Sequence, residues 1–265
     1  MRVKAHSTKR ESIMIDILLT ENLGAVRMLT MNRPEKRNAL NTALTQALLD
    51  ALRAADADDS VHCVVLAGAG LGFCAGADLS EFKDLTPDKQ HLVSARAQLT
   101  TDLHAIFSKM KKPVISAIQG AAMGGGAGLA LAGDMAVMAE SAKLGYPEVK
   151  HGIVAAIVMT NLTRQLGRKA AFELVAMGQP ISAARALELG MVNRVVADAE
   201  VMDETLAIAE HLAEVSPAAM AATKQTFHAV AELPFDQALE VGRMANERMR
   251  AHAKPVHASS KGNNS

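Results

Sequence analysis

Aromatic side chains are scarce in this chain of 265 residues, which has no tryptophan, one tyrosine and six phenylalanines. Proteins that bind single-stranded nucleic acid rely on such rings as stacking platforms, so the composition does not favour that class. An excess charge of one sign is also missing, because 28 lysines and arginines balance 28 aspartates and glutamates. A balanced chain has no general attraction to nucleic acid or to membranes. We therefore expect neither as a partner.

The chain also has few cysteines and no long apolar run. Cys63 and Cys74 are the only two cysteines; they build no disulfide framework, match no metal-site spacing and suit a reducing compartment. No run of 18 or more apolar residues is free of charges or glycine clusters, so we expect no membrane span. The basic first ten residues lack the apolar segment of a secretory signal, and a transit peptide stays open. The sequence thus predicts a cytoplasmic protein without a metal.

Short apolar runs alternate with an amphipathic segment in the first part of the chain. Residues 13–19 and 26–31 predict two strands of a hairpin around residues 21–24, and residues 63–68 predict a buried strand. Between them lies a helix that Asn41 or Thr42 would cap, with four leucines on one stripe: Leu44, Leu48, Leu49 and Leu52. Strand, helix, strand indicates a parallel βαβ unit and a mixed α/β fold. Further strands are expected at residues 113–118, 134–139 and 195–196, and only helices beyond residue 198.

The most glycine-dense stretch of the chain is residues 119–134, which follows the expected strand 113–118. Residues 128–132 are small and apolar and predict the start of a buried helix. A helix beginning among glycines exposes backbone N–H groups that have no partner within the helix and that attract negative charge. Two interpretations stay open at this point: one half of an oxyanion hole, or close packing of helix against strand.

Two other segments follow expected strand ends, where ligands collect in α/β proteins. Residues 70–79 form a second glycine-rich turn, and Tyr146-Pro147-Glu148 places a proline where a helix begins. Taken in order, Cys74-Ala75-Gly76-Ala77-Asp78-Leu79, Gly120-Ala121-Ala122-Met123-Gly124-Gly125-Gly126 and Tyr146-Pro147-Glu148-Val149 resemble the motifs of the crotonase family, the enoyl-CoA hydratase/isomerase superfamily. The resemblance extends from the loop at Asn32 to Asn193.

The family resemblance implies an α/β spiral of repeated ββα units over residues 1–197. It also implies a C-terminal helical region over residues 198–265 that assembles homotrimers or hexamers (dimers of trimers) and ends in a disordered tail. The substrate would be an acyl-CoA thioester, with coenzyme A as part of the substrate and no separate cofactor. The function would fall in fatty-acid, branched-chain or aromatic-acid breakdown.

The resemblance also assigns roles to residues. The backbone N–H groups of Ala77 and Gly125 would form an oxyanion hole for the thioester oxygen, where negative charge develops during proton transfer. The substrate would also lie along a further set: Lys36, Arg37, Ala39, Ala75, Asp78, Leu79, Gly124 and Tyr146. A phosphate contact by Lys36 or Arg37 competes with a plain solvated loop, and Tyr146 would either line the pocket or donate a hydrogen bond.

Enoyl-CoA hydratases of this family use two glutamates. One matches Glu148, whereas the other position, three residues after Gly125, holds Gly128. A single carboxylate can still move a proton from C2 to C4 of a 3-enoyl-CoA, so Δ3–Δ2 isomerisation by Glu148 is the first expectation. Hydration, or a hydratase-lyase reaction, with one glutamate is the second, and a non-catalytic acyl-CoA-binding homologue is the third. An acidic residue in the first turn of a helix is the alternative interpretation of Glu148.

We expect no catalytic role for the other polar residues near these motifs. His91 and His104 are expected on the protein surface, and Cys74 is expected to be a packing residue because no histidine base accompanies it. The C-terminal segments 241–250 and 254–257 depart from the family's usual acyl-CoA lid pattern, and residues 259–265 predict a disordered tail.

Overall fold

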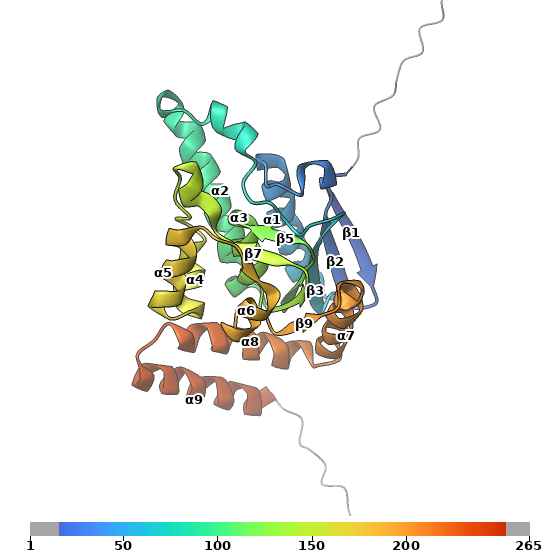
Figure 1. Ribbon diagram of the computed structural model, residues 1–265. Coiled ribbons are helices and arrows are strands. Elements are labelled where there is room, and N and C mark those ends of the chain that lie inside the picture. The colour runs from blue at the N-terminus through green and yellow to red at the C-terminus, as the bar shows by residue number, and fades with distance from the viewer. Residues whose placement is uncertain (1–15, 253–265) are drawn as a thin grey trace, which may run out of the picture.

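A computed structural model describes residues 16–252 of the chain. A central six-stranded sheet has the order β1 (Leu18–Leu23), β2 (Val26–Met31), β3 (Cys63–Gly68), β4 (Val114–Ile118), β6 (Met135–Ala139), β9 (Arg194–Val196). Every pairing after the antiparallel β1–β2 hairpin is parallel. A second, small sheet joins β5 (Ala121–Met123), β7 (Lys143–Gly145) and β8 (Ile181–Ser182). The predicted mixed α/β fold is confirmed (Figure 1).

The first βαβ unit forms as the sequence predicts. Helix α1 (Thr42–Ala57) connects β2 to β3, and its N-cap is Asn41, whose side chain accepts a hydrogen bond from the Leu44 N–H at 2.9 Å. The four leucines of the predicted stripe are all buried. The hairpin differs from the prediction, because β1 runs on to Leu23 and the turn falls at Gly24 and Ala25. Residues 13–15 lie outside the described part of the chain.

Two turns of the chain repeat a strand–strand–helix order. The first runs through β4, β5 and α3 (Gly125–Ala132), and the second runs through β6, β7 and the 3₁₀ helix η4 (Pro147–His151). The sequence reading missed β5, since three residues of alanine and methionine carry no strand signal, and it placed the start of α3 three residues too late. These corrections matter because the short strand β5 leads the chain directly to the N-terminus of α3.

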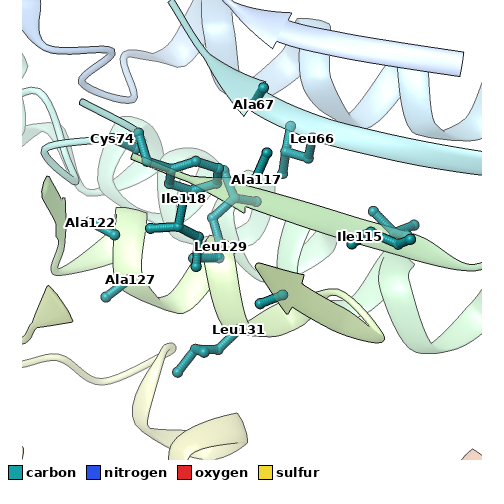
Figure 2. Packing of buried hydrophobic residues seen from close by; sticks show 14 of the residues in the cluster. Leu66, Ala67, Cys74, Ile115, Ala117, Ile118, Ala122, Ala127, Leu129 and Leu131 are labelled. Atoms are coloured by element: carbon teal, nitrogen blue, oxygen red, sulfur yellow. The ribbon is translucent and has the colours of Figure 1, made fainter. Parts of the chain in front are cut away.

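The core lies where α3 packs against the central sheet. Figure 2 shows buried side chains from β3, β4 and α3 meeting at this place, and those labelled from α3 are Ala127, Leu129 and Leu131. The residues of α3 are small or apolar throughout, which lets the helix sit close to the strands. Burial of this kind, worth roughly 25 cal/mol for each Å² of apolar surface, fixes the position of the helix N-terminus.

The remaining helices cover the sheets and form the C-terminal end: η1 (Pro34–Lys36), η2 (Leu79–Asp84), η3 (Pro87–Lys89), α2 (Gln90–Lys109), α4 (Met159–Gln165), α5 (Arg168–Met177), α6 (Ala183–Glu188), η5 (Asp198–Glu200), α7 (Val201–Ala213), α8 (Pro217–Ala231) and α9 (Phe235–His252). Helix α7 packs on the central sheet, whereas α8 and α9 lie side by side below it (Figure 1). Pro217 and Pro234 mark the expected helix breaks.

Some expectations about organisation are not decided by this arrangement. The division of the chain at residues 197 and 198 stays a prediction, and the expected disordered tail, 259–265, lies outside the described residues, as does the segment 254–257. None of the helices described between residues 16 and 252 has the length and apolar character needed to cross a membrane. Within the same range, no group of three or more histidine, cysteine, aspartate or glutamate side chains is arranged to hold a metal ion.

Candidate active site

The N-terminus of α3 is the first component of the site. Gly124 is the N-cap and has a φ of +54°, a left-handed value that glycine adopts easily. The first bond of the helix runs from the Gly128 N–H to the Gly124 carbonyl at 2.9 Å. The Gly125 N–H therefore belongs to the unpaired first turn, where the helix dipole favours negative charge. Gly125 is half-buried, which leaves its backbone open to a ligand.

The second component is the turn after β3. Gly76 has a φ of +92°, and a Cβ built on it would lie 3.2 Å from the Gly125 nitrogen and 2.6 Å from the Met123 carbonyl oxygen. The two glycine turns are therefore in direct backbone contact. A Cβ built on Gly125 would in turn lie 3.7 Å from the Ala77 nitrogen. The structure thus brings together the two backbone amides that the sequence singled out.

The Ala77 N–H is fixed in position by its neighbours but donates no hydrogen bond itself within the described part of the chain. A parallel bridge links Ala77 to Leu40 through two hydrogen bonds, from the Leu40 N–H to the Gly76 carbonyl at 2.7 Å and from the Asp78 N–H to the Leu40 carbonyl at 3.1 Å. Neither bond uses the Ala77 N–H, and this group donates to no other protein atom within residues 16–252. Two adjacent half-buried amides with free protons make a preorganised anion site.

The Glu148 carboxylate lies at Gly124, the residue before Gly125. Its Oε1 atom is 2.7 Å from the position of a Cβ built on Gly124, and its Oε2 atom is buried without a hydrogen-bond partner among the described residues. Pro147 begins η4 and places Glu148 in the first turn of this helix. Burial raises the pKa of the Glu148 carboxyl above its ordinary value. A carboxyl with these surroundings is suited to accept and return a proton.

Tyr146 is a buried residue two positions before Glu148. Its side chain is only 1% exposed, and its hydroxyl has no hydrogen-bond partner among residues 16–252. Burial, together with the negative charge of Glu148, raises the pKa of the Tyr146 hydroxyl. The hydroxyl therefore stays protonated at neutral pH and is available as a donor.

A buried network that the sequence reading missed positions the Ala77 turn. Asn38, at a φ of +56°, donates from its amide to the carbonyls of Ala69 and Gly72, both at 2.9 Å, and accepts from the Arg33 N–H at 3.0 Å. A buried polar side chain with all its bonds made specifies one arrangement of the loops it joins. The positive φ of a buried asparagine cannot be read from the sequence, so no signal pointed to it.

Asp78 belongs to this positioning network too. One carboxylate oxygen pairs with Arg33 at 2.9 Å, with side chains 12% and 9% exposed for the arginine and the aspartate, and the other accepts from the Ser80 N–H and hydroxyl. These hydrogen bonds hold the pKa of Asp78 below its ordinary value, with the bond from Ser80 the largest cause. Both oxygens are thus engaged by the protein itself.

The space beside Gly128 is already filled. A Cβ built on Gly128 would lie 2.3 Å from Cγ1 of Val158 and 3.1 Å from Cε1 of His104. Val158 immediately precedes α4 and packs its buried side chain against α3. A side chain at position 128 would therefore collide with Val158, so an apolar side chain fills the space where the second glutamate of a hydratase would lie.

The two histidines expected on the surface have different positions. His91 is exposed at the start of α2, as predicted, whereas the prediction for His104 is wrong, since its side chain is buried between α2 and α3. Leu103, His104 and Phe107 form the buried face of α2, and this spacing of apolar neighbours was the signal that could have found the burial.

The other residues expected along the substrate are partly or fully exposed, apart from the buried Gly124. Lys36, Arg37, Ala75 and Leu79 are exposed, and Ala39 is half-buried. The Arg37 carbonyl accepts a hydrogen bond from the Ala75 N–H at 2.9 Å, so this loop lies directly against the first glycine turn. Cys74 is buried, and its thiol donates to the Asn38 carbonyl at 3.1 Å; burial raises its pKa to about 12. Cys74 is a packing residue, as predicted.

Comparison with known proteins identifies the family to which the chain belongs. Residues 21–262 match the model of the family described as enoyl-CoA hydratase/isomerase. The chain belongs to this family. Two relatives from Escherichia coli, strain K12, are a 2,3-dehydroadipyl-CoA hydratase, 37% identical over 87% of each chain, and a 1,2-epoxyphenylacetyl-CoA isomerase, 34% identical over 87% of this chain and 88% of the relative.

Solved structures give the same answer for the fold. An enoyl-CoA hydratase from Mycobacterium smegmatis matches with a TM-score of 0.85 and 32% identity over 89% of this chain and 91% of its own. The crotonase fold expected from the three motifs is therefore confirmed for this member of the enoyl-CoA hydratase/isomerase family. The relatives include both a hydratase and an isomerase, so family membership alone does not specify which reaction this protein catalyses.

The packing at Gly128 gives a prediction about stability. We expect Gly128→Ala to lower the free energy of unfolding by about 1–3 kcal/mol, because the added methyl group overlaps the Val158 side chain. In the Gly128→Ala/Val158→Ala double variant the methyl group gains room, so the combined loss should be smaller than the sum of the single losses by roughly 0.5–3 kcal/mol. Urea unfolding of the four proteins measures this coupling. Strictly additive losses would show that the two side chains do not compete for one space.

Proposed function

We propose that this family member is an acyl-CoA thioester isomerase that moves a double bond from the Δ3 to the Δ2 position. Glu148 takes a proton from C2 of a 3-enoyl-CoA, and the electrons shift to the thioester oxygen. The N–H groups of Ala77 and Gly125 stabilise the resulting oxyanion, each by about 3 kcal/mol of barrier in comparable sites. The protonated Glu148 then returns the proton at C4, so one carboxylate serves both steps.

The observation that carries the proposal is the half-buried Glu148 carboxylate at the N-terminus of α3, whose Oε2 atom has no partner among the described residues, with Val158 in the place of a second acid. Addition of water needs one group to activate the water and one to protonate C2, whereas isomerisation needs one group in total. The proposed chemistry transfers a proton only, so coenzyme A as part of the substrate suffices and no further cofactor is required. Hydration, or a hydratase-lyase reaction, with Glu148 as the one glutamate and a water held by backbone groups is the alternative, because relatives include a hydratase.

The experiment is a panel of 3-enoyl-CoA and 2-enoyl-CoA thioesters analysed by mass spectrometry. A 3-enoyl-CoA carrying deuterium at C2 should give 2-enoyl product with part of the deuterium at C4, since the same carboxyl returns it. Formation of 3-hydroxyacyl-CoA from 2-enoyl-CoA, without isomerisation, would support the hydratase alternative. Tight binding of every thioester with no turnover would support a non-catalytic acyl-CoA-binding protein.

We also propose that Lys36 and Arg37 contact the coenzyme A phosphates, and that Ala39, Ala75, Leu79, Gly124 and Tyr146 line the path of the substrate. The support is the exposure of both cations on the loop that contacts the first glycine turn. The proposal does not extend to direct contact by Asp78, because its carboxylate is engaged by Arg33 and Ser80. The cytoplasmic location remains a prediction.

Helices α8 and α9 carry the proposed homotrimer, or hexamer, interface. Phe227 and Phe235 are 66% and 75% exposed, and Leu239 lies on the same helix as Phe235 with more than half of its side chain exposed. Large apolar groups exposed together indicate a protein contact. Sedimentation velocity should give a trimer or a multiple of it, and Phe235→Asp should shift the protein toward the monomer.

A further inference from the structure

Arg33 is a cation beside the candidate site that the proposed proton transfer does not use. Its guanidinium donates through Nη1 to the Ala39 carbonyl and through Nη2 to the Asp78 carboxylate, the second bond at 2.9 Å. The side chain is only 12% exposed, so water competes little for either bond. A charged donor makes a hydrogen bond roughly twice as strong as a neutral one, such as that from the Asn41 N–H to the same carbonyl. The Ala39 carbonyl is therefore strongly polarised.

Two peptide groups connect this cation to the Ala77 amide. The Ala39 carbonyl shares a peptide group with the Leu40 N–H, which donates to the Gly76 carbonyl at 2.7 Å. The Gly76 carbonyl in turn shares a peptide group with the Ala77 N–H, which donates to no protein atom within residues 16–252. The order is thus the guanidinium, the Ala39–Leu40 peptide, the Gly76–Ala77 peptide and a free N–H.

The links of this chain all act in the same direction. A hydrogen bond accepted by a peptide oxygen draws electron density away from the peptide nitrogen, which makes the N–H of that peptide a stronger donor. Hydrogen bonds in a chain strengthen one another in this way by about 10–30% per bond. The positive character of the Ala77 N–H therefore rises at the place proposed for the thioester oxygen.

We propose that Arg33 is a positioning residue of the oxyanion hole, which acts through the Ala39–Leu40 and Gly76–Ala77 peptides to strengthen the Ala77 N–H as a donor. The inference rests on the proposed function in one respect, since it requires the thioester oxygen to bind the Ala77 N–H. The effect is larger in the transition state than in the bound substrate, because negative charge on the oxygen grows as the proton is transferred.

The first test is steady-state kinetics of Arg33→Met on the thioester that the protein turns over. We expect kcat to fall about 5- to 10-fold, a part of the 10²–10³-fold that loss of a whole oxyanion donor costs. The dissociation constant of butyryl-CoA should stay within about twofold, since binding alone develops little charge on the oxygen. Arg33→Lys keeps the charge but loses the fork that reaches both acceptors, and its kcat should be intermediate.

Arg27→Met is the matched control. Arg27 lies at the opposite end of β2, pairs with Asp58 at 2.8 Å and is also 12% exposed, and its printed bonds run to side chains alone. The variant therefore loses a comparable ion pair without touching the chain of peptides, and it should keep its kcat. An equal loss of kcat in Arg27→Met and Arg33→Met would overturn the proposal.

An unpaired Asp78 is a second way in which Arg33→Met could slow the reaction, because its carboxylate lies one residue from Ala77. The double variant Arg33→Met/Asp78→Asn removes both charges. Its kcat should remain about 5- to 10-fold below that of Asp78→Asn alone. If these two variants have equal kcat, charge neutralisation explains the effect and the proposal is wrong.

The infrared carbonyl stretch of bound butyryl-CoA, labelled with ¹³C at the thioester carbon, measures the polarisation directly. The band should lie at lower wavenumber in the unaltered protein than in water, and Arg33→Met, but not Arg27→Met, should move it back toward the value in water. The same band position in Arg33→Met and the unaltered protein would contradict the inference alone, whereas no displacement in the unaltered protein would remove the proposed oxyanion hole as well. If Arg33→Met does not fold, Arg33→Lys and the double variant provide the same comparison.

Discussion

Glu148→Gln should lower kcat by about 10³-fold on whichever thioester the protein turns over. The substitution keeps the size and the half-buried position of the side chain, but an amide cannot take a proton from C2. Loss of a positioned acid or base group costs 10²–10⁴-fold in comparable enzymes, and here the same group is proposed for both proton transfers. Steady-state kinetics with the preferred 3-enoyl-CoA, or 2-enoyl-CoA if hydration is found, measures the effect.

Binding provides the control for this variant, because the amides of Ala77 and Gly125 are unchanged. The dissociation constant of a saturated acyl-CoA should stay within a few-fold of the original. Activity retained to within tenfold would exclude Glu148 as the proton carrier. A loss of binding as large as the loss of turnover would instead assign the residue to substrate binding.

The raised pKa of Glu148 also predicts how the activity and the stability of the unaltered protein depend on pH. The carboxylate must be ionised to accept a proton, so kcat/KM should fall as pH drops through a value above the ordinary glutamate pKa of about 4.3. For stability the sign is opposite: a carboxyl with a raised folded-state pKa favours folding when protonated, and this advantage is lost as pH rises through that pKa. Glu148→Gln should therefore be at least as stable as the original protein at pH 7, and thermal unfolding at pH 4 and pH 7 checks it.

Gly76→Ala should lower kcat/KM by at least about 100-fold. The added Cβ would meet the Met123 carbonyl oxygen at 2.6 Å and the Gly125 nitrogen at 3.2 Å, so the two glycine turns must separate. Separation moves the Ala77 and Gly125 amides apart, and removal of a single oxyanion donor already costs about 10²–10³-fold in other enzymes. The measurement is kcat/KM, with unfolding by urea as a parallel check on stability.

Gly24→Ala supplies the matched control for Gly76→Ala. Gly24 also has a positive φ, +59°, but a Cβ built on it meets nothing within 4 Å. It should lose about 1–2 kcal/mol of stability from the left-handed backbone alone and keep its activity. Equal loss of activity in both variants would mean that backbone strain, and not the contact between the turns, explains the effect.

The sequence predicts well those parts of the molecule that depend on local patterns. The stripe of leucines and the Asn41 cap define α1, and the apolar, β-branched run at residues 114–118 defines β4, because periodicity and capping are properties of neighbouring residues. The three motifs also located the two amides and Glu148, although the short strands β5 and β7, which directly precede Gly125 and Glu148, were not predicted. Their convergence follows from the parallel order of those strands.

What the sequence did not predict depends on contacts between distant segments. The Asn38 bridges to Ala69 and Gly72 join residues more than 30 positions apart, and the pairing of Asp78 with Arg33 spans 45 positions. His104 is an intermediate case, because the spacing of Leu103 and Phe107 marks the buried face of α2, whereas its contact with Gly128 of α3 is not marked by any local pattern. Tertiary packing decides the environment of a polar side chain, and local propensity carries no information about it.

Helix α9 contacts the rest of the described chain chiefly through α8. A helix supported along one side by a single neighbour opens locally at a small free-energy cost, well below that of global unfolding. Its amide hydrogens should therefore exchange with solvent far sooner than those of β3 or β4 when the protein is dilute. Association of subunits through this helix would slow the exchange, so that the concentration of the protein itself becomes a variable controlling the order of its C-terminal end.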